Sequence, residues 1–174
     1  MPNASHIHVR PLEIGDFEFV RDLASKQRNF TIPPIYVLWL MLRIKGAISL
    51  VAEHSRRGPL AYLLAVPVDG PEDSMFVWQL AVSKGPEREK ATLVLLTQFN
   101  NIVRDLAVRN IVFSSVPNSA AFRAIRRYAS KVFSSAPMAV NALPPAVDSK
   151  ESEFLLDLGH ARRSDSSTIK MRVN

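Results

Sequence analysis

The sequence contains no cysteine, and its 174 residues include only six glycines. Without cysteine the chain can form neither a disulfide framework nor a thiolate zinc site, and it has no cysteine nucleophile. No window holds the roughly eighteen consecutive apolar residues that a membrane helix needs, and Met1–Ala4 lacks the basic-then-apolar pattern of a signal peptide. We therefore expect a cytoplasmic protein without a membrane partner.

Several catalytic signatures are also missing. The sequence has no Gly-x-Ser-x-Gly elbow and no phosphate-binding P-loop, and none of its four histidines stands at metal-binding spacing to another. We predict no metal site. The net charge of +6 permits an anionic partner, either a polyphosphate cofactor or a nucleic acid. Nucleic acid is the less favoured of the two, because its binding would rest on Arg123, Arg126, Arg127 and the tail, which have no interleaved aromatics.

What the chain does contain is a core. Hydrophobic residues make up 47% of the sequence, enough for one compact domain, which we expect over residues 1–159. Residues 160–174 are Ser-rich and basic, and we expect a flexible tail there. Alternating and helical periodicities predict the order of elements before the central stretch. They are strands over 6–12, 47–54, 60–68 and 75–82, and helices over 16–26 and 33–43.

The central stretch is Phe76–Phe99, an apolar strand, a short polar loop and an amphipathic helix. The unpaired first-turn amides and the dipole of such a helix favour an anion. The β-branched run after this helix suggests a crossover to a parallel neighbour. The remaining predicted elements are helices over 90–108 and 119–129, strands over 110–116, 132–133 and 153–158, and a loop over 136–148.

Three segments carry a resemblance to a known superfamily. Phe76–Val82 reads FVWQLAV, Ile35–Met41 reads IYVLWLM, and Ser115–Ile125 reads SVPNSAAFRAI. Together with the order of elements, which covers 7–158, they resemble the GCN5-related N-acetyltransferases, and within that superfamily the diaminobutyrate acetyltransferases of ectoine synthesis. The resemblance implies an α/β domain with a mixed, mostly antiparallel, bent sheet that has helices on both faces.

The resemblance also implies a site for acetyl-CoA. In this superfamily the strand equivalent to Phe76–Val82 splays from its neighbour, and its free backbone groups bind the acetyl-pantetheine arm. The backbone of Leu80 and Val82 would serve here. The other interpretation of the same residues is an ordinary central strand.

The next loop departs from the superfamily pattern Arg/Gln-x-x-Gly-x-Gly/Ala, whose small residues let backbone amides wrap a pyrophosphate. In one register the motif positions fall on Glu87, Lys90 and Thr92, and in the other on Arg88, Ala91 and Leu93, so neither restores both glycines. Lys90 offers a compensating cation, whereas Glu87 and Glu89 oppose an anion. The segment is either a phosphate site or a plain helix start. Its candidate ligand residues are Arg88, Glu89, Lys90, Ala91 and Thr92.

Two further residues occupy positions of interest. Asn118 matches an asparagine that commonly bonds the pantetheine arm, although it could equally cap the following helix. Seven residues on, where many members carry the tyrosine that protonates the departing thiolate, this chain has Ile125. Tyr128, one turn later on the same helical face, is the candidate substitute, with a packed aromatic as the other interpretation.

On the acceptor side, Tyr36 and Trp78 are the candidate pocket walls. The Asp-x-Asn-Ser pattern that precedes the helix in the diaminobutyrate enzymes is replaced by Thr31, Pro33 and Pro34, which removes the carboxylate partner of an ammonium. The resemblance implies direct acetyl transfer from acetyl-CoA to a small amine or amino acid, and a homodimer is common among such proteins. The alternative is a protein that keeps the fold and acts as a binding or regulatory module.

Overall fold

The computed structural model describes residues 6–27, 30–68, 73–140 and 152–158. The predicted tail over 160–174 and most of the predicted loop over 136–148 lie outside these residues. The described strands are β1 (Ile7–Pro11), β2 (Ile48–His54), β3 (Gly58–Val68), β4 (Ser74–Val82), β5 (Asn110–Ser115), β6 (Met138–Val140) and β7 (Ser152–Asp157). The helices are η1 (Ile14–Asp16), α1 (Phe17–Ser25), α2 (Ile35–Met41), α3 (Arg88–Asp105), α4 (Ala120–Tyr128) and η2 (Ala129–Phe133).

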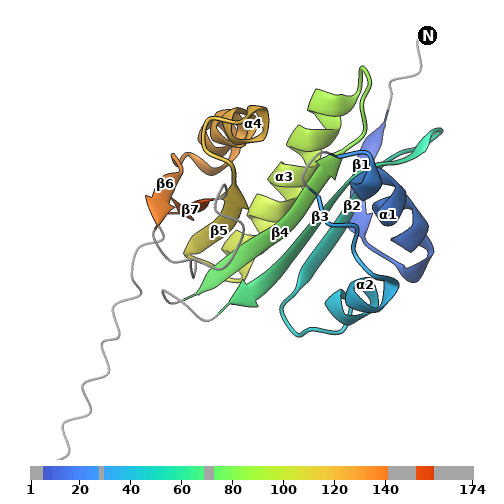
Figure 1. The fold of residues 1–174 in the computed structure, drawn as a ribbon, viewed down its shortest axis with the longest axis horizontal. Helices are drawn as coiled ribbons and strands as arrows, with labels where there is room; N and C mark the ends of the chain where they lie inside the picture. Colours follow the sequence, from blue (N-terminus) through green and yellow to red (C-terminus); the bar gives the residue numbers. More distant parts are fainter. Residues whose placement is uncertain (1–5, 28–29, 69–72, 141–151, 159–174) are drawn as a thin grey trace, which may run out of the picture.

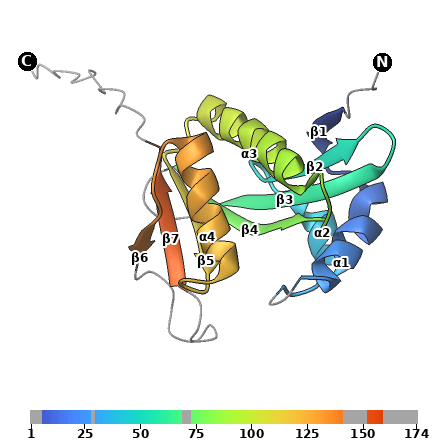
Figure 2. The ribbon, with the colours of Figure 1, turned by 90° about the horizontal axis from the view of Figure 1, so that it is seen from above.

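One seven-stranded sheet runs through the molecule in the order β1-β2-β3-β4-β5-β7-β6. Its described pairs are antiparallel except β4 with β5, which is parallel, as the crossover through α3 requires. Helices α1 and α2 cover one face, and α3 and α4 cover the other (Figure 1). Figure 2 shows β5 and β7 turned steeply away from β3 and β4. The predicted fold, a mixed, mostly antiparallel, bent sheet with helices on both faces, is confirmed.

The sheet separates two hydrophobic cores. Alternate residues of β3 serve both, because successive side chains point to opposite faces: Leu63 lies in the core under α3, whereas Tyr62 and Leu64 lie in the core under α1 and α2. Phe99 of α3 is almost completely buried in the first core, and Leu38 of α2 is fully buried in the second. The central strands are therefore covered on both sides, which explains their long apolar runs.

Three details differ from the sequence expectations. The short strand expected over 132–133 is wrong, because Ala129–Phe133 continues α4 as a π-helical turn that buries Phe133 against the ring of Phe99. Part of the expected loop over 136–148 is the strand β6. The second helix ends at Met41, so Arg43 lies beyond it and places its guanidinium over the ring of Trp39 at 4.3 Å. Each difference is a long-range or packing effect that local periodicity does not encode.

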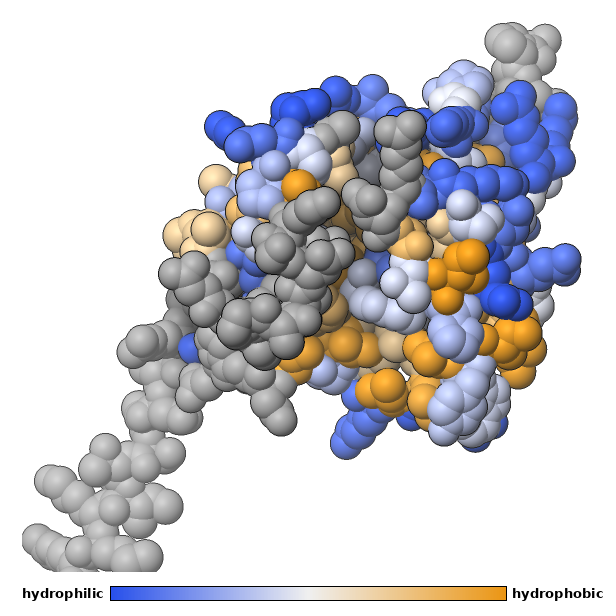
Figure 3. Space-filling model, viewed as in Figure 1, coloured by the Kyte–Doolittle hydropathy of each residue, from blue (hydrophilic) through white to orange (hydrophobic). Residues whose placement is uncertain are grey.

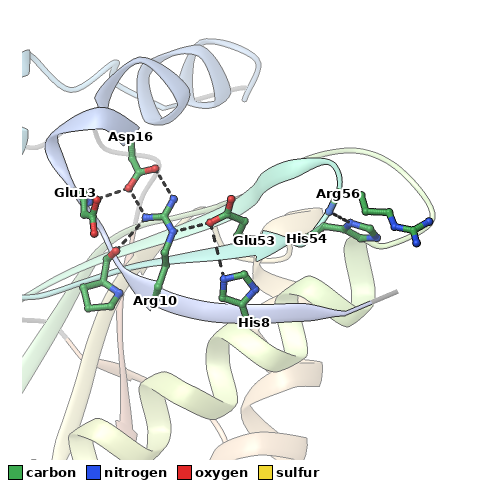
Figure 4. Close-up of polar contacts among 8 residues, drawn as sticks. His8, Arg10, Glu13, Asp16, Glu53, His54 and Arg56 are labelled. Atoms are coloured by element: carbon green, nitrogen blue, oxygen red, sulfur yellow. Dashed lines mark hydrogen bonds and ion pairs between the residues drawn. The ribbon is translucent and has the colours of Figure 1, made fainter. Parts of the chain in front are cut away.

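A network around Arg10 fastens β1 to β2 and to η1 (Figure 4). The Arg10 guanidinium donates to both carboxylate oxygens of Asp16, at 2.7 and 2.8 Å, and its Nε donates to Glu53 at 2.6 Å. Asp16 also accepts the backbone N–H of Glu13 at 2.8 Å. The hydrogen bonds from Arg10 lower the pKa of the buried Asp16 carboxyl, and the same contacts raise the pKa of Arg10. The network holds the beginning of α1 on the sheet.

Helices in the described ranges are all too short or too polar to cross a membrane. Within the same ranges, no three His, Asp or Glu side chains gather in a way that would hold a metal ion.

Candidate functional site

Strands β4 and β5 separate part-way along the sheet. Their parallel pairing begins at Ser74 opposite Asn110 and ends at Val77 opposite Phe113. Beyond that point β5 continues beside β7 as far as Ser115, while β4 continues beside β3 as far as Val82. The expectation that this strand splays from its parallel neighbour is confirmed, and the interpretation as an ordinary central strand is wrong.

A β-bulge accompanies the separation. Gln79 is opposite Leu64 and Val77 is opposite Ala65, so Trp78 is an extra residue in β4. A bulge bends its strand, strengthens the local twist and can place two successive side chains on the same face. Accordingly Trp78 packs against the core under α1 and α2, and Gln79 bonds Tyr62 of that same core. The bulge stands where β4 leaves β5.

Past the bulge, the backbone of β4 is directed into the gap at every second residue. The N–H of Ser83 donates to the carbonyl of Leu60 at 2.8 Å, which makes these two a hydrogen-bonded pair of the antiparallel ladder. Because hydrogen-bonded and non-bonded pairs alternate, the N–H and C=O groups of Leu80 and Val82 point away from β3, toward the side that β5 has left. An extended ligand lying in the gap could bond both residues.

The start of α3 lies directly after this part of β4. The helix begins at Arg88, so Arg88–Thr92 forms its first turn rather than a loop. Gly85 takes a φ of +144° and its carbonyl accepts the N–H of Arg88 at 3.2 Å, so the only glycine between β4 and α3 serves the turn itself. Ala91 and Thr92 are buried, whereas Arg88, Glu89 and Lys90 are exposed.

Glu89 connects the two helices that flank the gap. Its carboxylate accepts a hydrogen bond from the guanidinium of Arg127, at the end of α4, and lies 3.9 Å from the ammonium of Lys131. Sequence reasoning placed Glu89 among the candidate ligand residues of the phosphate site and noted that its negative charge would oppose an anion. The pair spans 38 residues of sequence, and no local signal could have revealed it. Its effect is to offset the negative charge at the start of α3 with two cations from α4 and η2.

The candidate residues of α4 lie at its two ends. Asn118 is exposed and has a left-handed φ of +60°, and its carbonyl accepts the guanidinium of Arg123 at 2.6 Å. It is not the helix cap: Ser119 is, with its hydroxyl accepting the N–H of Phe122 at 3.0 Å. Tyr128 is half-buried against the same core as Leu80 and Val82. The structure thus brings Tyr128 to the core that lines this part of β4, and its role stays a prediction.

On the opposite face, Gln79 links two segments of the chain through its side-chain amide. The hydroxyl of the fully buried Tyr62 donates to Gln79 at 2.9 Å, and the Gln79 amide donates to the carbonyl of Thr31 at 2.8 Å. Burial raises the pKa of Tyr62, so it remains a neutral donor. The chain Tyr62 to Gln79 to Thr31 holds the segment between α1 and α2 against the bulged part of β4.

Tyr36 and Trp78 have different surroundings. Trp78 is half-buried in the core under α1 and α2, whereas Tyr36 is 66% exposed on the outer face of α2, where it stacks on Trp39 with 6.0 Å between ring centroids. The structure does not bring these two residues together in one core, and their assignment as pocket walls remains a prediction.

Comparison with known proteins gives a result at the level of structure. No protein-family model matches the sequence, and no curated protein matches it. A diaminobutyrate acetyltransferase from Paenibacillus lautus, solved with L-2,4-diaminobutyric acid and coenzyme A, matches with a TM-score of 0.70 and 19% identity over 88% of this chain and 96% of that one. An acetyltransferase of the GNAT family from Staphylococcus aureus Mu50 matches with a TM-score of 0.68 and 12% identity, over 88% and 99%. This chain has the GNAT fold.

The GNAT fold recurs in a third neighbour. The ribosomal-protein-S18-alanine N-acetyltransferase from Escherichia coli matches with a TM-score of 0.66 and 16% identity, over 91% of this chain and 98% of that one. The resemblance that the sequence motifs carried is therefore confirmed as a likeness of fold. At identities of 12–19%, what these neighbours share with this chain is the fold.

Proposed function

We propose that this protein is an acetyl-CoA-dependent N-acetyltransferase that acts on a small amine or amino acid. The observation that carries the proposal is the gap beyond Val77, into which Leu80 and Val82 direct their backbone groups. An acetyl-pantetheine arm is extended and amide-rich, so it can take the place of the missing strand. The diaminobutyrate acetyltransferase neighbour was solved with coenzyme A, which supports the same ligand class here.

Some residues of this chain would bind the cofactor, and others would take part in the transfer reaction. The N–H of Leu80 would polarise the thioester carbonyl, because a fixed donor aimed at a developing oxyanion lowers the barrier. The hydroxyl of Tyr128 would donate a proton to the departing thiolate, and Asn118 would bond the pantetheine arm. On the other face, the bond from Gln79 to Thr31 would fix the segment that the acceptor amine passes. Transfer would be direct, within one ternary complex.

The phosphates would lie at the first turn of α3. Its amides and dipole favour an anion, and Arg88 and Lys90 supply exposed cations. The two glycines of the superfamily motif are absent, so side chains replace part of the backbone cradle. Because Glu89 is paired with Arg127 and Lys131, its charge opposes the phosphates less than the sequence alone suggests.

Acetyl-CoA is expected to stabilise the fold. Ligand at a hundredfold over its dissociation constant should add about 2.7 kcal/mol to the free energy of unfolding. Differential scanning calorimetry with and without acetyl-CoA measures this, with adenosine monophosphate as the control for unspecific anion binding. An unchanged melting temperature at millimolar acetyl-CoA would refute the enzyme proposal.

Lys90→Glu and Glu89→Gln are expected to change acetyl-CoA affinity in opposite directions. Reversing the Lys90 charge should weaken binding roughly tenfold, because a like charge then faces the phosphates. Glu89→Gln should tighten it, since Arg127 and Lys131 lose their carboxylate partner. Titration calorimetry at low ionic strength measures both, and Arg57→Glu in the exposed turn between β2 and β3 is the matched control for a charge reversal elsewhere. Equal affinities in all four proteins would show that the phosphates lie away from this turn.

A binding or regulatory module is the second candidate function. The ion pairs of Glu89 favour it, because they join the start of α3 to α4 and η2 through side chains of the chain itself. The two functions differ in turnover: a module would bind coenzyme A or nothing, and it would release no thiol from acetyl-CoA in the presence of any member of a panel of small amines, amino acids and polyamines.

A further inference from the structure

Helix α2 is apolar on its outer face as well as its inner one. Leu38 and Met41 are buried in the core beneath it, but its outer face exposes large apolar and aromatic side chains to solvent. A helix that is hydrophobic all round is normally covered on all sides. We call this exposed surface the α2 patch. It consists of Ile32, Ile35, Tyr36, Trp39 and Leu42, together with Ile14 and Ile44 beside the end of the helix.

The α2 patch is continuous along the helix. Ile14, Leu42 and Ile44 line one groove at the end of α2, of about 640 Å³, and Ile32 and Ile35 line a second groove at its beginning, of about 510 Å³. The stacked rings of Tyr36 and Trp39 lie between the two grooves. Figure 3 shows hydrophobic side chains gathered over this region of the molecule, around paler ones.

The composition and size of the α2 patch are those of a protein interface. Tyr, Trp and Arg are the residues enriched at the energetic centre of interfaces, and here Tyr36, Trp39 and Arg43 are already stacked on one another in the single chain. From their exposed fractions, the seven apolar side chains present roughly 700 Å², close to the about 800 Å² that each partner of a stable interface buries. Monomers rarely expose a patch of that size.

We propose that the α2 patch is the interface with a second copy of this chain, with the two α2 helices packed antiparallel across a twofold axis. The rim carries charges of both signs: Glu18, Arg21 and Asp22 line the groove at the beginning of α2, and Arg43 and Lys45 follow its end. Antiparallel packing sets Glu18 of one copy near Arg43 and Lys45 of the other, twice over, as a self-complementary contact requires. An anionic membrane surface is the main rival occupant, because Arg21, Arg43 and Lys45 also lie at the rim.

A dimer through α2 would also steady the proposed acceptor side. The segment that leads into α2 carries Thr31, whose carbonyl accepts the Gln79 amide on β4. Immobilising α2 against a partner therefore limits the motion of a segment that lies against the bulge. The interface involves none of the residues that line the gap between β4 and β5, but it includes Tyr36, a candidate wall of the acceptor pocket.

Sedimentation equilibrium at micromolar concentration tests the interface. The full-length chain is expected to run as a species of twice 19.4 kDa. Tyr36→Glu is expected to weaken self-association at least tenfold while folding normally, because a carboxylate suits the first turn of a helix. Leu106→Glu is the matched control, since Leu106 is 54% exposed at the end of α3, outside the patch. A wild-type monomer, or an equal loss in both variants, would overturn the proposal.

A charge exchange tests the antiparallel arrangement. Arg43→Glu should weaken the dimer, and adding Glu18→Arg in the same chain should restore it, because each reversed pair is then re-formed across the axis. Failure of the double variant to recover would overturn the antiparallel packing. Sedimentation with vesicles rich in phosphatidylserine tests whether the patch binds an anionic membrane instead. If the chain is monomeric, binds these vesicles and loses that binding on Tyr36→Glu, the patch is a membrane-binding surface and the dimer proposal is overturned.

Discussion

Replacing Leu80 by proline is expected to slow acetyl transfer roughly 100- to 1,000-fold, the usual effect of removing one oxyanion donor. Proline removes the backbone N–H that would polarise the thioester carbonyl. Because this N–H points into the gap, the substitution removes no bond of the ladder with β3. The sheet should survive, and the loss should fall on kcat rather than on acetyl-CoA affinity. The measurement is the rate of thiol release from acetyl-CoA, with the amine that a screen identifies.

Two variants control for the other consequences of this change. Leu80→Ala keeps the N–H and removes the side chain, so its rate should stay within a few-fold of wild type. Ala81→Pro removes an N–H that faces Tyr62 in the ladder, so it should unfold or strongly destabilise the protein. Circular dichroism establishes which variants are folded. A folded Leu80→Pro variant with nearly wild-type kcat would show that the gap does not hold the reacting carbonyl.

Replacing Arg10 by methionine is expected to destabilise the fold by about 3 kcal/mol, the cost of leaving a buried carboxylate without its partner. Asp16 is only 6% exposed, and it loses two hydrogen bonds in this variant, while Glu53 loses one. Methionine retains most of the aliphatic stem, so the effect reports on the guanidinium. Urea unfolding at neutral pH measures it. Lys26→Met is the control, because the exposed pair of Lys26 with Asp22 should contribute under about 0.5 kcal/mol.

The contribution of Arg10 to the free energy of unfolding decreases in acid. Arg10 lowers the pKa of Asp16 below its ordinary value of 3.8, so the contribution is fully present above that value and is lost as pH falls through the folded-state pKa. The difference in stability between wild type and Arg10→Met should therefore shrink in acid. A difference that stays constant down to pH 2 would mean that Asp16 is not the group that Arg10 stabilises.

Much of the fold follows from local patterns in the sequence. Alternation over 47–82 specified a three-stranded meander, and the helical period of the next segment specified the crossover that makes β5 parallel to β4. The segment with proline, asparagine and serine before α4 indicated a helix start, although the cap is Ser119 rather than Asn118. These features are readable because each depends on residues within a few positions of one another.

The candidate site was predictable in part. FVWQLAV pointed, through resemblance, to the strand that separates from β5, and the missing glycines were visible in the sequence. The bulge at Trp78 was not, because it depends on the register between β3 and β4. The pairing of Glu89 with Arg127 and the bond from Gln79 to Thr31 were equally hidden, since their partners are 38 and 48 residues away.

The sequence by itself determined most of the strands and helices as far as Ala129, because periodicity and capping are local properties of the chain. Only the tertiary structure decided where β4 leaves β5, which backbone groups face the gap, and that α2 keeps an apolar outer face. Those features depend on strand register and on contacts between distant segments, in which a shift of one residue reverses every side chain and every N–H of a strand.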